Sequence, residues 1–174
     1  MMTMDFIAQN SKEKFGKEPK DLRVAIIHED GAYGVDVSKG NEAGAKKAGF
    51  NIVLKEGYAA TAPDLSALVT KLRRAQPDVI LHTGYNPDIT LFLRQSREQG
   101  LKFKGVIGHG AGYGQISKLM ETFGKDVNYV YNVDPVAAFS SIVASGGRLN
   151  AWATLNALAN PTPEVTVRVD AANV

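Results

Sequence analysis

Short apolar runs alternate with amphipathic stretches along the first three quarters of the chain. Five of the runs have the length and the apolar character of buried strands, at residues 24–27, 50–57, 79–82, 105–108 and 128–133. The stretches between them have apolar positions at helical spacing, which predicts helices over residues 35–48, 62–74, 87–99 and 116–123. A further amphipathic helix is predicted at the N-terminus, with Met4, Ile7, Ala8 and Phe15 on its buried face.

The helix over residues 62–74 shows the pattern clearly. Its apolar positions follow the spacing i, i+3, i+4 and i+7, which places them on one face: Leu65, Leu68, Val69 and Leu72. Thr61 is a candidate N-cap for this helix, and Asn86 is one for the next helix, because short polar side chains accept hydrogen bonds from free backbone N–H groups. Asp88 then falls in a first helical turn, where negative charge is favoured.

Strands that alternate with helices predict an α/β fold with a parallel sheet that is covered on both faces. We expect a flavodoxin-like, doubly wound, three-layer α/β/α arrangement with the strand order 2-1-3-4-5. In that order the chain leaves strands 1 and 3 toward opposite faces of the sheet. A crevice is therefore expected beyond the carboxyl ends of these two strands.

The character of the sequence changes near residue 135, which predicts a boundary. We expect residues 1–134 to form one α/β lobe and residues 135–174 to form a tail that is poor in charge. The tail is consistent with a hinge remnant, a helix at NAWATLNALAN and a strand at EVTVRVDA, with the pair Gly146-Gly147 as a hinge or linker. The sequence leaves open whether the tail packs on this lobe or associates with another chain.

Composition excludes several classes of function. The net charge of +2 on 174 residues is too small to indicate a nucleic-acid partner. The absence of cysteine excludes a disulfide framework and a thiolate metal site. No apolar run approaches the roughly 20 residues that span a bilayer, and residues 1–21 lack the basic start and the apolar block of a signal peptide, so no export signal is expected there.

Two tyrosines follow the two strands that flank the expected crevice. Tyr33 lies in the turn EDGAYG after the first strand, and Tyr85 lies in TGYNPD after the third. Each could simply close the end of the sheet, but as a pair they favour a small-molecule pocket. The turn EDGAYG could also hold an anion at the start of the following helix, although a tight strand–helix turn explains its glycines equally well.

Catalytic chemistry has weaker support. His28, His82 and His109 all fall at strand ends, so a three-histidine metal site is one alternative, set against ordinary hydrogen-bonded histidines. The acids near the crevice, Glu29, Asp30 and Asp88, are candidate bases, but no nucleophile and orienting group accompany them. We therefore expect no enzyme, no catalytic residues, no bound metal and no cofactor.

The order and spacing of these motifs resemble a known family. VAIIHEDGAYG, then KEGYAATAPDLSALVTKLRRAQPDVILHTGYNPD, then LRQSREQGLKFKGVIG are similar to the second lobe of type I periplasmic solute-binding proteins. Within that family, the resemblance is to the leucine/isoleucine/valine-binding proteins of branched-chain amino acid ABC transporters. The resemblance covers residues 4–135, and it implies that the family's ligand-binding tyrosines correspond to Tyr33 and Tyr85.

The resemblance also implies a ligand and partners. The family's third contact, a carboxylate for the ligand's ammonium, corresponds to Gly110, so His109 or Tyr113 is expected to replace it. Asp30 and Asn86, in the two tyrosine-bearing turns, are further candidate contacts. The implied ligand is a small amino acid, a carboxylate or an aromatic acid.

The family's architecture implies more than this chain contains. The first lobe, which normally precedes this region, is missing, and a loaded binding protein docks on a membrane permease in the periplasm. A cytosolic ligand-sensing regulatory domain stays open as a second function, because folds of this kind recur in regulators. The histidine-metal hydrolase is a third alternative.

Overall fold

Five strands form the central sheet of the structure, a computed structural model that describes residues 2–133. All of them are parallel, and their spatial order is β2-β1-β3-β4-β5, as the sequence predicted. The strands are β1 (Arg23–Glu29), β2 (Asn51–Tyr58), β3 (Val79–Thr83), β4 (Gly105–His109) and β5 (Val130–Val133).

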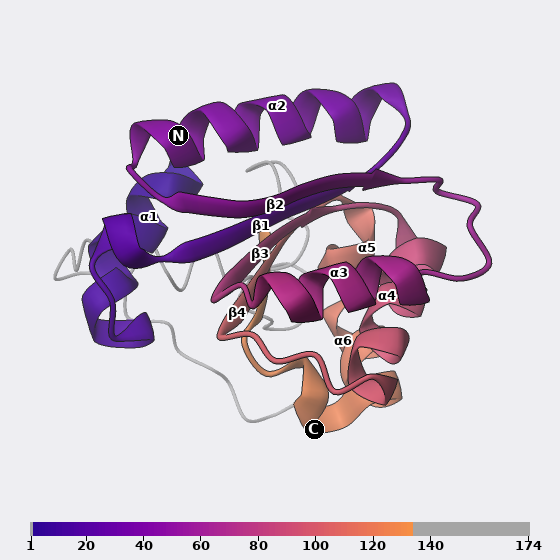
Figure 1. Cartoon of the computed structure of the whole chain (residues 1–174). Helices are drawn as coiled ribbons and strands as arrows, with labels where there is room; N and C mark the ends of the chain where they lie inside the picture. Colours follow the sequence, from indigo (N-terminus) through magenta and orange to yellow (C-terminus); the bar gives the residue numbers. More distant parts are fainter. Residues whose placement is uncertain (1, 134–174) are drawn as a thin grey trace, which may run out of the picture.

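Helices cover both faces of the sheet (Figure 1). They are α1 (Met2–Asn10), α2 (Ala32–Lys47), α3 (Ser66–Ala75), α4 (Asn86–Glu98), α5 (Ala111–Gly114) and α6 (Ile116–Phe123), with a π-helical turn η1 (Ser11–Phe15) and the 3₁₀-helical turns η2 (Pro19–Asp21) and η3 (Gly124–Val127). The first two helices pack on one face, and the other four pack on the opposite face. Within residues 2–133, no helix is both long enough and apolar enough to cross a bilayer.

Each face of the sheet has its own apolar core, because side chains alternate along a strand. Ala25 and Ile27 of β1 point toward α3 and α4, whereas Val24 and Ile26 point toward α1 and α2. All four are completely buried. The doubly wound, three-layer prediction is therefore confirmed.

Helix faces were predicted better than helix starts. The apolar face of α3 is buried as expected: Leu65, Leu68, Val69 and Leu72. Thr61, however, does not cap this helix, which begins at Ser66, where the Asp64 carboxylate accepts hydrogen bonds from the Ser66 backbone N–H and hydroxyl. The prediction for Asn86 was also wrong by one residue, since Tyr85 occupies the N-cap position and Asn86 is the first helical residue.

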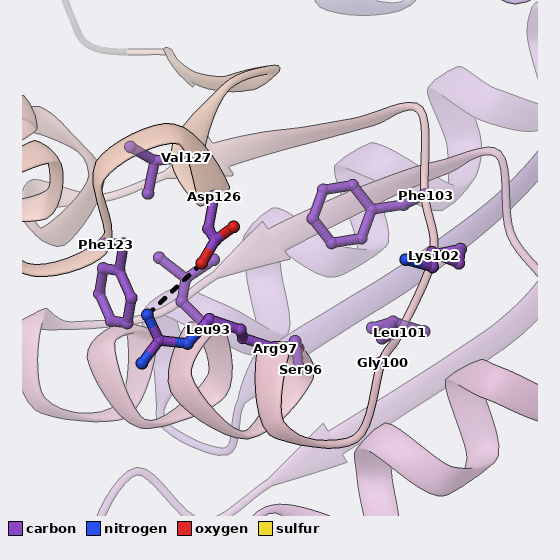
Figure 2. A pocket seen from close by; sticks show the side chains of 10 residues that line it. All are labelled: Leu93, Ser96, Arg97, Gly100, Leu101, Lys102, Phe103, Phe123, Asp126 and Val127. Atoms are coloured by element: carbon purple, nitrogen blue, oxygen red, sulfur yellow. Dashed lines mark hydrogen bonds and ion pairs between the residues drawn. The ribbon is translucent and has the colours of Figure 1, made fainter.

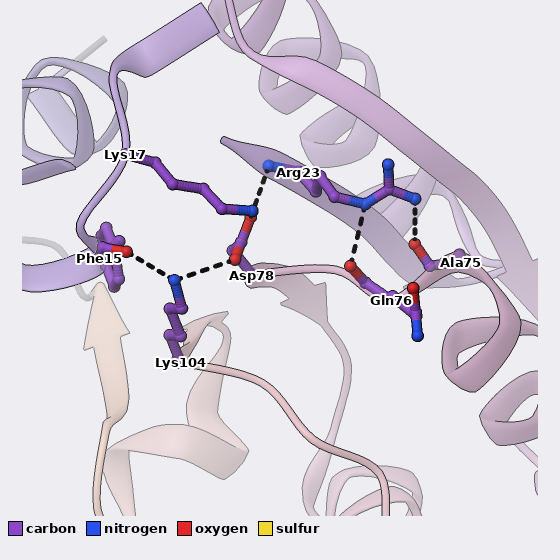
Figure 3. Close-up of polar contacts among 7 residues, drawn as sticks. All are labelled: Phe15, Lys17, Arg23, Ala75, Gln76, Asp78 and Lys104. Atoms are coloured by element: carbon purple, nitrogen blue, oxygen red, sulfur yellow. Dashed lines mark hydrogen bonds and ion pairs between the residues drawn. The ribbon is translucent and has the colours of Figure 1, made fainter. Parts of the chain in front are cut away.

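At the amino ends of the strands, Asp78 joins segments that are far apart in the sequence (Figure 3). Its carboxylate accepts a hydrogen bond from Lys17 Nζ at 2.7 Å and one from the Arg23 backbone N–H at 2.9 Å, and Lys104 Nζ lies 3.3 Å away. Burial raises the pKa of Asp78, but hydrogen bonds from Lys17, the Arg23 backbone and Lys104 together bring it below its ordinary value. This one side chain therefore holds together the N-terminal segment, β1, β3 and the loop that precedes β4.

The sequence-based predictions for residues 135–174 lie outside the described residues. These are the low-charge tail, its helix and strand, the Gly146-Gly147 hinge and self-association.

Candidate functional site

β1 and β3, the two strands beyond which the crevice is expected, end side by side. β1 continues into α2 on one face of the sheet, and β3 continues into α4 on the other (Figure 1). Tyr33 is in the first turn of α2, and Tyr85 is the residue before α4. Their side chains are 47% and 48% exposed, respectively, although both are large aromatic groups. The fold therefore presents two tyrosines at the topological switch point of the sheet.

The turn that carries Tyr33 is organised by Glu29, the last residue of β1. Its carboxylate is 1% exposed and accepts hydrogen bonds from the backbone N–H groups of Gly31 and Gly34, the second at 2.6 Å. These N–H groups lie on either side of Tyr33 in the sequence and would otherwise be unpaired at the helix start. The anion site that the sequence offered at EDGAYG is thus occupied by the chain's own carboxylate, and Glu29 is a capping residue rather than a base.

A second carboxylate organises the turn that carries Tyr85. Asp88 is 2% exposed, and its Oδ1 accepts the Tyr85 backbone N–H at 2.8 Å. The helix-start role that the sequence indicated for Asp88 is confirmed. Asp30, by contrast, is exposed, and its Oδ1 accepts the Ala60 backbone N–H at 3.2 Å, which connects the turns after β1 and β2.

Beneath Tyr85 the other oxygen of Asp88 begins a buried series of hydrogen bonds. The Tyr58 hydroxyl donates to Asp88 Oδ2 at 2.5 Å and lies 2.7 Å from His82 Nε2. His82 Nδ1 lies 2.5 Å from the Tyr113 hydroxyl. Tyr58, His82 and Tyr113 are 8%, 0% and 1% exposed, so water does not compete for these partners.

His82 is held in its neutral form at ordinary pH. Burial lowers the pKa of His82 from 6.5 to about 3, and the neighbouring His109 and His28 add to the effect. Burial also lowers the pKa of His109, to about 4. Neutral imidazole has one donor and one acceptor nitrogen, which matches the two tyrosine hydroxyls on either side of His82.

His109, at the end of β4, and Tyr113, in α5, were the two expected replacement contacts, and they differ in their surroundings. Tyr113 lies in the core, so its position does not match the expected direct contact with a ligand. His109 is partly exposed, and its Nδ1 atom has no hydrogen-bond partner among the described residues. Asn86 is partly exposed at the start of α4, next to Tyr85. Gly110 has φ +118, a conformation that L side chains rarely adopt, and a Cβ there would lie 2.6 Å from the Gly84 carbonyl oxygen.

The three histidines do not assemble a metal centre. The residues that the structure describes contain no group of three or more histidine, aspartate or glutamate side chains placed to hold a metal ion. His82 has both ring nitrogens paired with tyrosines, and His28 Nδ1 lies 2.7 Å from the Glu29 carbonyl oxygen. Side chains alternate along a strand, and the register places His82 on the opposite face of the sheet from His28 and His109.

A cavity of about 150 Å³ lies at the opposite edge of the sheet, where strands begin (Figure 2). Arg97 of α4 lines it, with the guanidinium 3.4 Å from Asp126 Oδ2 and 5.7 Å from the centre of the Phe123 ring. Its walls come from the end of α4, the loop before β4, the end of α6 and η3: Leu93, Ser96, Arg97, Gly100, Leu101, Lys102, Phe103, Phe123, Asp126 and Val127. Neither Tyr33 nor Tyr85 lines this cavity.

Sequence reasoning missed the buried series and the capping role of Glu29. One available signal was the glycine spacing in TGYNPD and GHGAGYG. A Cβ on Gly84 would lie 2.5 Å from Asp88 Oδ2 and 2.7 Å from the Tyr58 hydroxyl, and one on Gly108 would overlap the Tyr113 ring. Glycine in a strand or just after it often marks a position where another group approaches the backbone closely, as the Tyr113 ring does at Gly108.

The family follows from a comparison with known proteins. The family model described as periplasmic binding protein matches residues 2–147. This chain belongs to the periplasmic binding protein family. The α/β fold, the strand order and the resemblance noted in the sequence are all consistent with that family.

Relatives in this family are longer than this chain. Leu/Ile/Val-binding protein homolog 7 of Brucella suis biovar 1 is 39% identical over 134 residues, which are 76% of this chain and 33% of that protein. A periplasmic binding protein type 1 from Bordetella pertussis Tohama I has a similar structure, with a TM-score of 0.58 and 25% identity over 73% of this chain and 32% of that one. A putative branched-chain amino acid ABC transporter structure from Silicibacter pomeroyi gives a TM-score of 0.63 at 22% identity, over 83% of this chain and 38% of that one. This chain spans about a third of the length of the curated relatives it matches.

Proposed function

We propose that residues 1–134 are one ligand-binding lobe of a non-enzymatic ABC-transporter substrate-binding protein, and that the ligand is a small amino acid or another small carboxylic acid. The observation that carries the proposal is the pair of half-exposed tyrosines, Tyr33 and Tyr85, at the switch point of the sheet. Their rings offer an apolar wall, and their hydroxyls offer hydrogen bonds. Membership of the periplasmic binding protein family supports this role.

The charges around the crevice favour a ligand whose ammonium group faces this lobe. The turns after β1, β2, β3 and β4, at residues 29–34, 58–62, 83–88 and 109–115, contain no lysine or arginine. The carboxylates of Glu29 and Asp88 are buried and accept backbone N–H groups, whereas the carboxylate of Asp30 is exposed and accepts the Ala60 backbone N–H at 3.2 Å through Oδ1. We therefore propose that Asp30 attracts the ligand's ammonium in place of the carboxylate that is missing at Gly110, with His109 and Asn86 as further polar contacts.

The proposal includes the family's first lobe and a membrane partner. A ligand on this lobe alone stays half in water, so affinity is expected to be weak until another lobe covers it. We propose that the first lobe belongs to the same binding protein, that it binds the ligand's carboxylate, and that the loaded protein delivers the ligand to a permease in the periplasm. The curated relative named a Leu/Ile/Val-binding protein homolog supports this role.

The test is a titration of the chain with L-leucine, L-phenylalanine and benzoate, followed by NMR amide shifts. Tyr33→Ala and Tyr85→Ala should each weaken binding about tenfold, the equivalent of about 1.4 kcal/mol. Tyr129→Ala is the matched control, because Tyr129 is 66% exposed but lies just before β5, at the amino ends of the strands and away from the crevice. Binding that neither crevice substitution changes would contradict the proposed site.

A separate variant tests the ligand class. Asp30→Asn removes the exposed charge and should weaken the binding of L-leucine several-fold while leaving benzoate unchanged, because only the amino acid has an ammonium group. Equal effects on both compounds would show that Asp30 does not select for the ammonium. Binding of benzoate but not of leucine would restrict the ligand to carboxylic acids without an amino group.

A further inference from the structure

Four buried side chains from four different elements form one hydrogen-bonded series beneath the crevice. The series runs from Tyr113 in α5 through His82 in β3 and Tyr58 at the end of β2 to Asp88 in α4. None of these side chains is more than 8% exposed. Its last member also accepts the backbone N–H of Tyr85, so the series ends at a residue of the crevice.

The partners fix the direction of every hydrogen bond. A carboxylate only accepts, so the Tyr58 hydroxyl donates to Asp88. Tyr58 has then used its one proton, and His82 Nε2 must carry the proton that it donates to Tyr58. His82 Nδ1 is consequently an acceptor for the Tyr113 hydroxyl. Each member has one role, and removing any one of them leaves a buried neighbour without a partner.

Packing leaves these groups little room to move. The His82 ring makes edge-on contacts with the rings of Tyr58, Phe92 and Tyr113, at centroid distances of 5.7, 4.7 and 5.5 Å. The missing side chain of Gly84 gives Asp88 and Tyr58 the space in which they meet. A shift at one end of the series is therefore transmitted rather than absorbed.

The series connects two turns that face the crevice. Tyr113 lies in α5, shortly after His109 at the end of β4, whereas Tyr85 follows β3. The two turns also touch directly, since the Gly84 N–H lies 3.4 Å from the His109 carbonyl oxygen.

We propose that Tyr58, His82 and Tyr113 are positioning residues. Through Asp88 they fix the position of Tyr85, and they couple the turn after β4 to the turn after β3. Side chains outside the crevice thereby set the affinity of the crevice for its ligand. This inference rests on the proposed role of Tyr85 as a ligand contact.

The first test needs no ligand. Tyr58→Phe and Tyr113→Phe each remove one hydroxyl and keep the ring, and amide hydrogen exchange is measured residue by residue. The Tyr85 amide should exchange at least tenfold faster in Tyr58→Phe and several-fold faster in Tyr113→Phe, after correction for the change at the Ile26 amide in the core of β1. Tyr131→Phe, a matched loss of a tyrosine hydroxyl on β5, should leave the corrected rate unchanged.

A purely structural role predicts a different result. The Tyr85 and Ile26 amides would then change by the same factor in both variants, which would overturn the inference. His82→Gln provides a third variant, because its amide offers one donor and one acceptor to the two tyrosines and should restore part of the protection of Tyr85 relative to His82→Ala. Equal exchange rates of the Tyr85 amide in His82→Gln and His82→Ala would also contradict the inference.

The second test uses L-leucine as the probe. Tyr113→Phe should weaken binding several-fold, although Tyr113 does not reach the crevice, and Tyr131→Phe should not. If the unmodified chain binds neither leucine nor benzoate, the proposed function fails while the exchange measurement still decides the inference. If the chain binds leucine and Tyr113→Phe binds it equally well, the inference fails and the proposed function stands.

Discussion

Single carboxylates hold the turns around the crevice by accepting backbone N–H groups, a role that the sequence indicated for Asp88 but not for Glu29. Glu29 is an acid at the end of a strand, which is also where a general base or an anion-binding turn is found. Its burial and its two backbone donors show that it completes the start of α2 and thereby holds the turn that carries Tyr33. Whether Glu29 acts as a base or completes the helix start depends on the direction of its side chain. That direction follows from the turn geometry and not from the residue type.

Glu29→Gln should destabilise the chain by about 1–3 kcal/mol, because the amide nitrogen would face a backbone N–H group and leave a buried donor unpaired. Urea unfolding measures the change. Glu13→Gln is the matched control, since Glu13 pairs with Lys14 on the surface and its side chain is 73% exposed, so its loss should change stability by less than about 0.5 kcal/mol. Equal effects of the two substitutions would contradict the capping role.

His82 should make stability depend on pH in the mildly acidic range. Its pKa is about 3 in the folded chain and 6.5 when unperturbed, so between these values the unfolded state binds more protons. Stability therefore falls as the pH is lowered below about 6.5, by up to about 1.4 kcal/mol per pH unit from this residue. The urea midpoint should show a shallower slope between pH 6.5 and 4 in His82→Gln, and an unchanged slope would contradict this assignment.

At the scale of elements, the strands and the buried faces of the helices were predictable, and the helix starts were not. Apolar spacing places Leu68 and Leu72 on one face wherever α3 begins, because the 3.6-residue period does not depend on the cap. The start itself depends on which polar side chain reaches the free N–H groups. At α3 this is Asp64 rather than Thr61.

Two glycines provide a matched test of packing against helix propensity. Gly108→Ala places a methyl group into the Tyr113 ring and should destabilise the chain by about 1–3 kcal/mol. Gly40→Ala in the exposed face of α2 meets nothing within 4 Å and should stabilise by about 0.5–1 kcal/mol. Thermal unfolding measures both changes, and the same sign for the two variants would contradict the packing around Tyr113.

At the scale of the whole molecule, the two edges of the sheet have different roles. The edge where strands end carries the crevice, and the edge where they begin is fastened by Asp78 and its three donors (Figure 3). Because these donors come from the N-terminal segment, β1 and the loop before β4, their contribution depends on the complete fold. Asp78 lies between Gln76-Pro77 and a strand, where the sequence alone suggests only a loop residue.

Asp78→Asn should lower the free energy of unfolding by about 1–3 kcal/mol, because the amide cannot accept from two lysines and a backbone N–H group together. The pKa of Asp78 is depressed in the folded chain, so its contribution is complete above pH 4 and is lost as the pH falls through the folded value. Asp126→Asn is the control, since it removes an exposed ion pair with Arg97 and should change stability by less than about 0.5 kcal/mol. Similar losses in both variants, measured by urea unfolding, would contradict the role of Asp78.

The sequence by itself determined the α/β class, the strand order and the positions of Tyr33 and Tyr85 after neighbouring strands, because these depend on periodicity and on the connection rules for parallel sheets. Only the tertiary structure decided that the carboxylate of Glu29 is occupied by backbone donors, and that His82 and Tyr113 are joined in the core. Those contacts link residues that are far apart in the chain, such as Tyr58 and Asp88. Their partners depend on side-chain direction and close packing, which local sequence patterns do not specify.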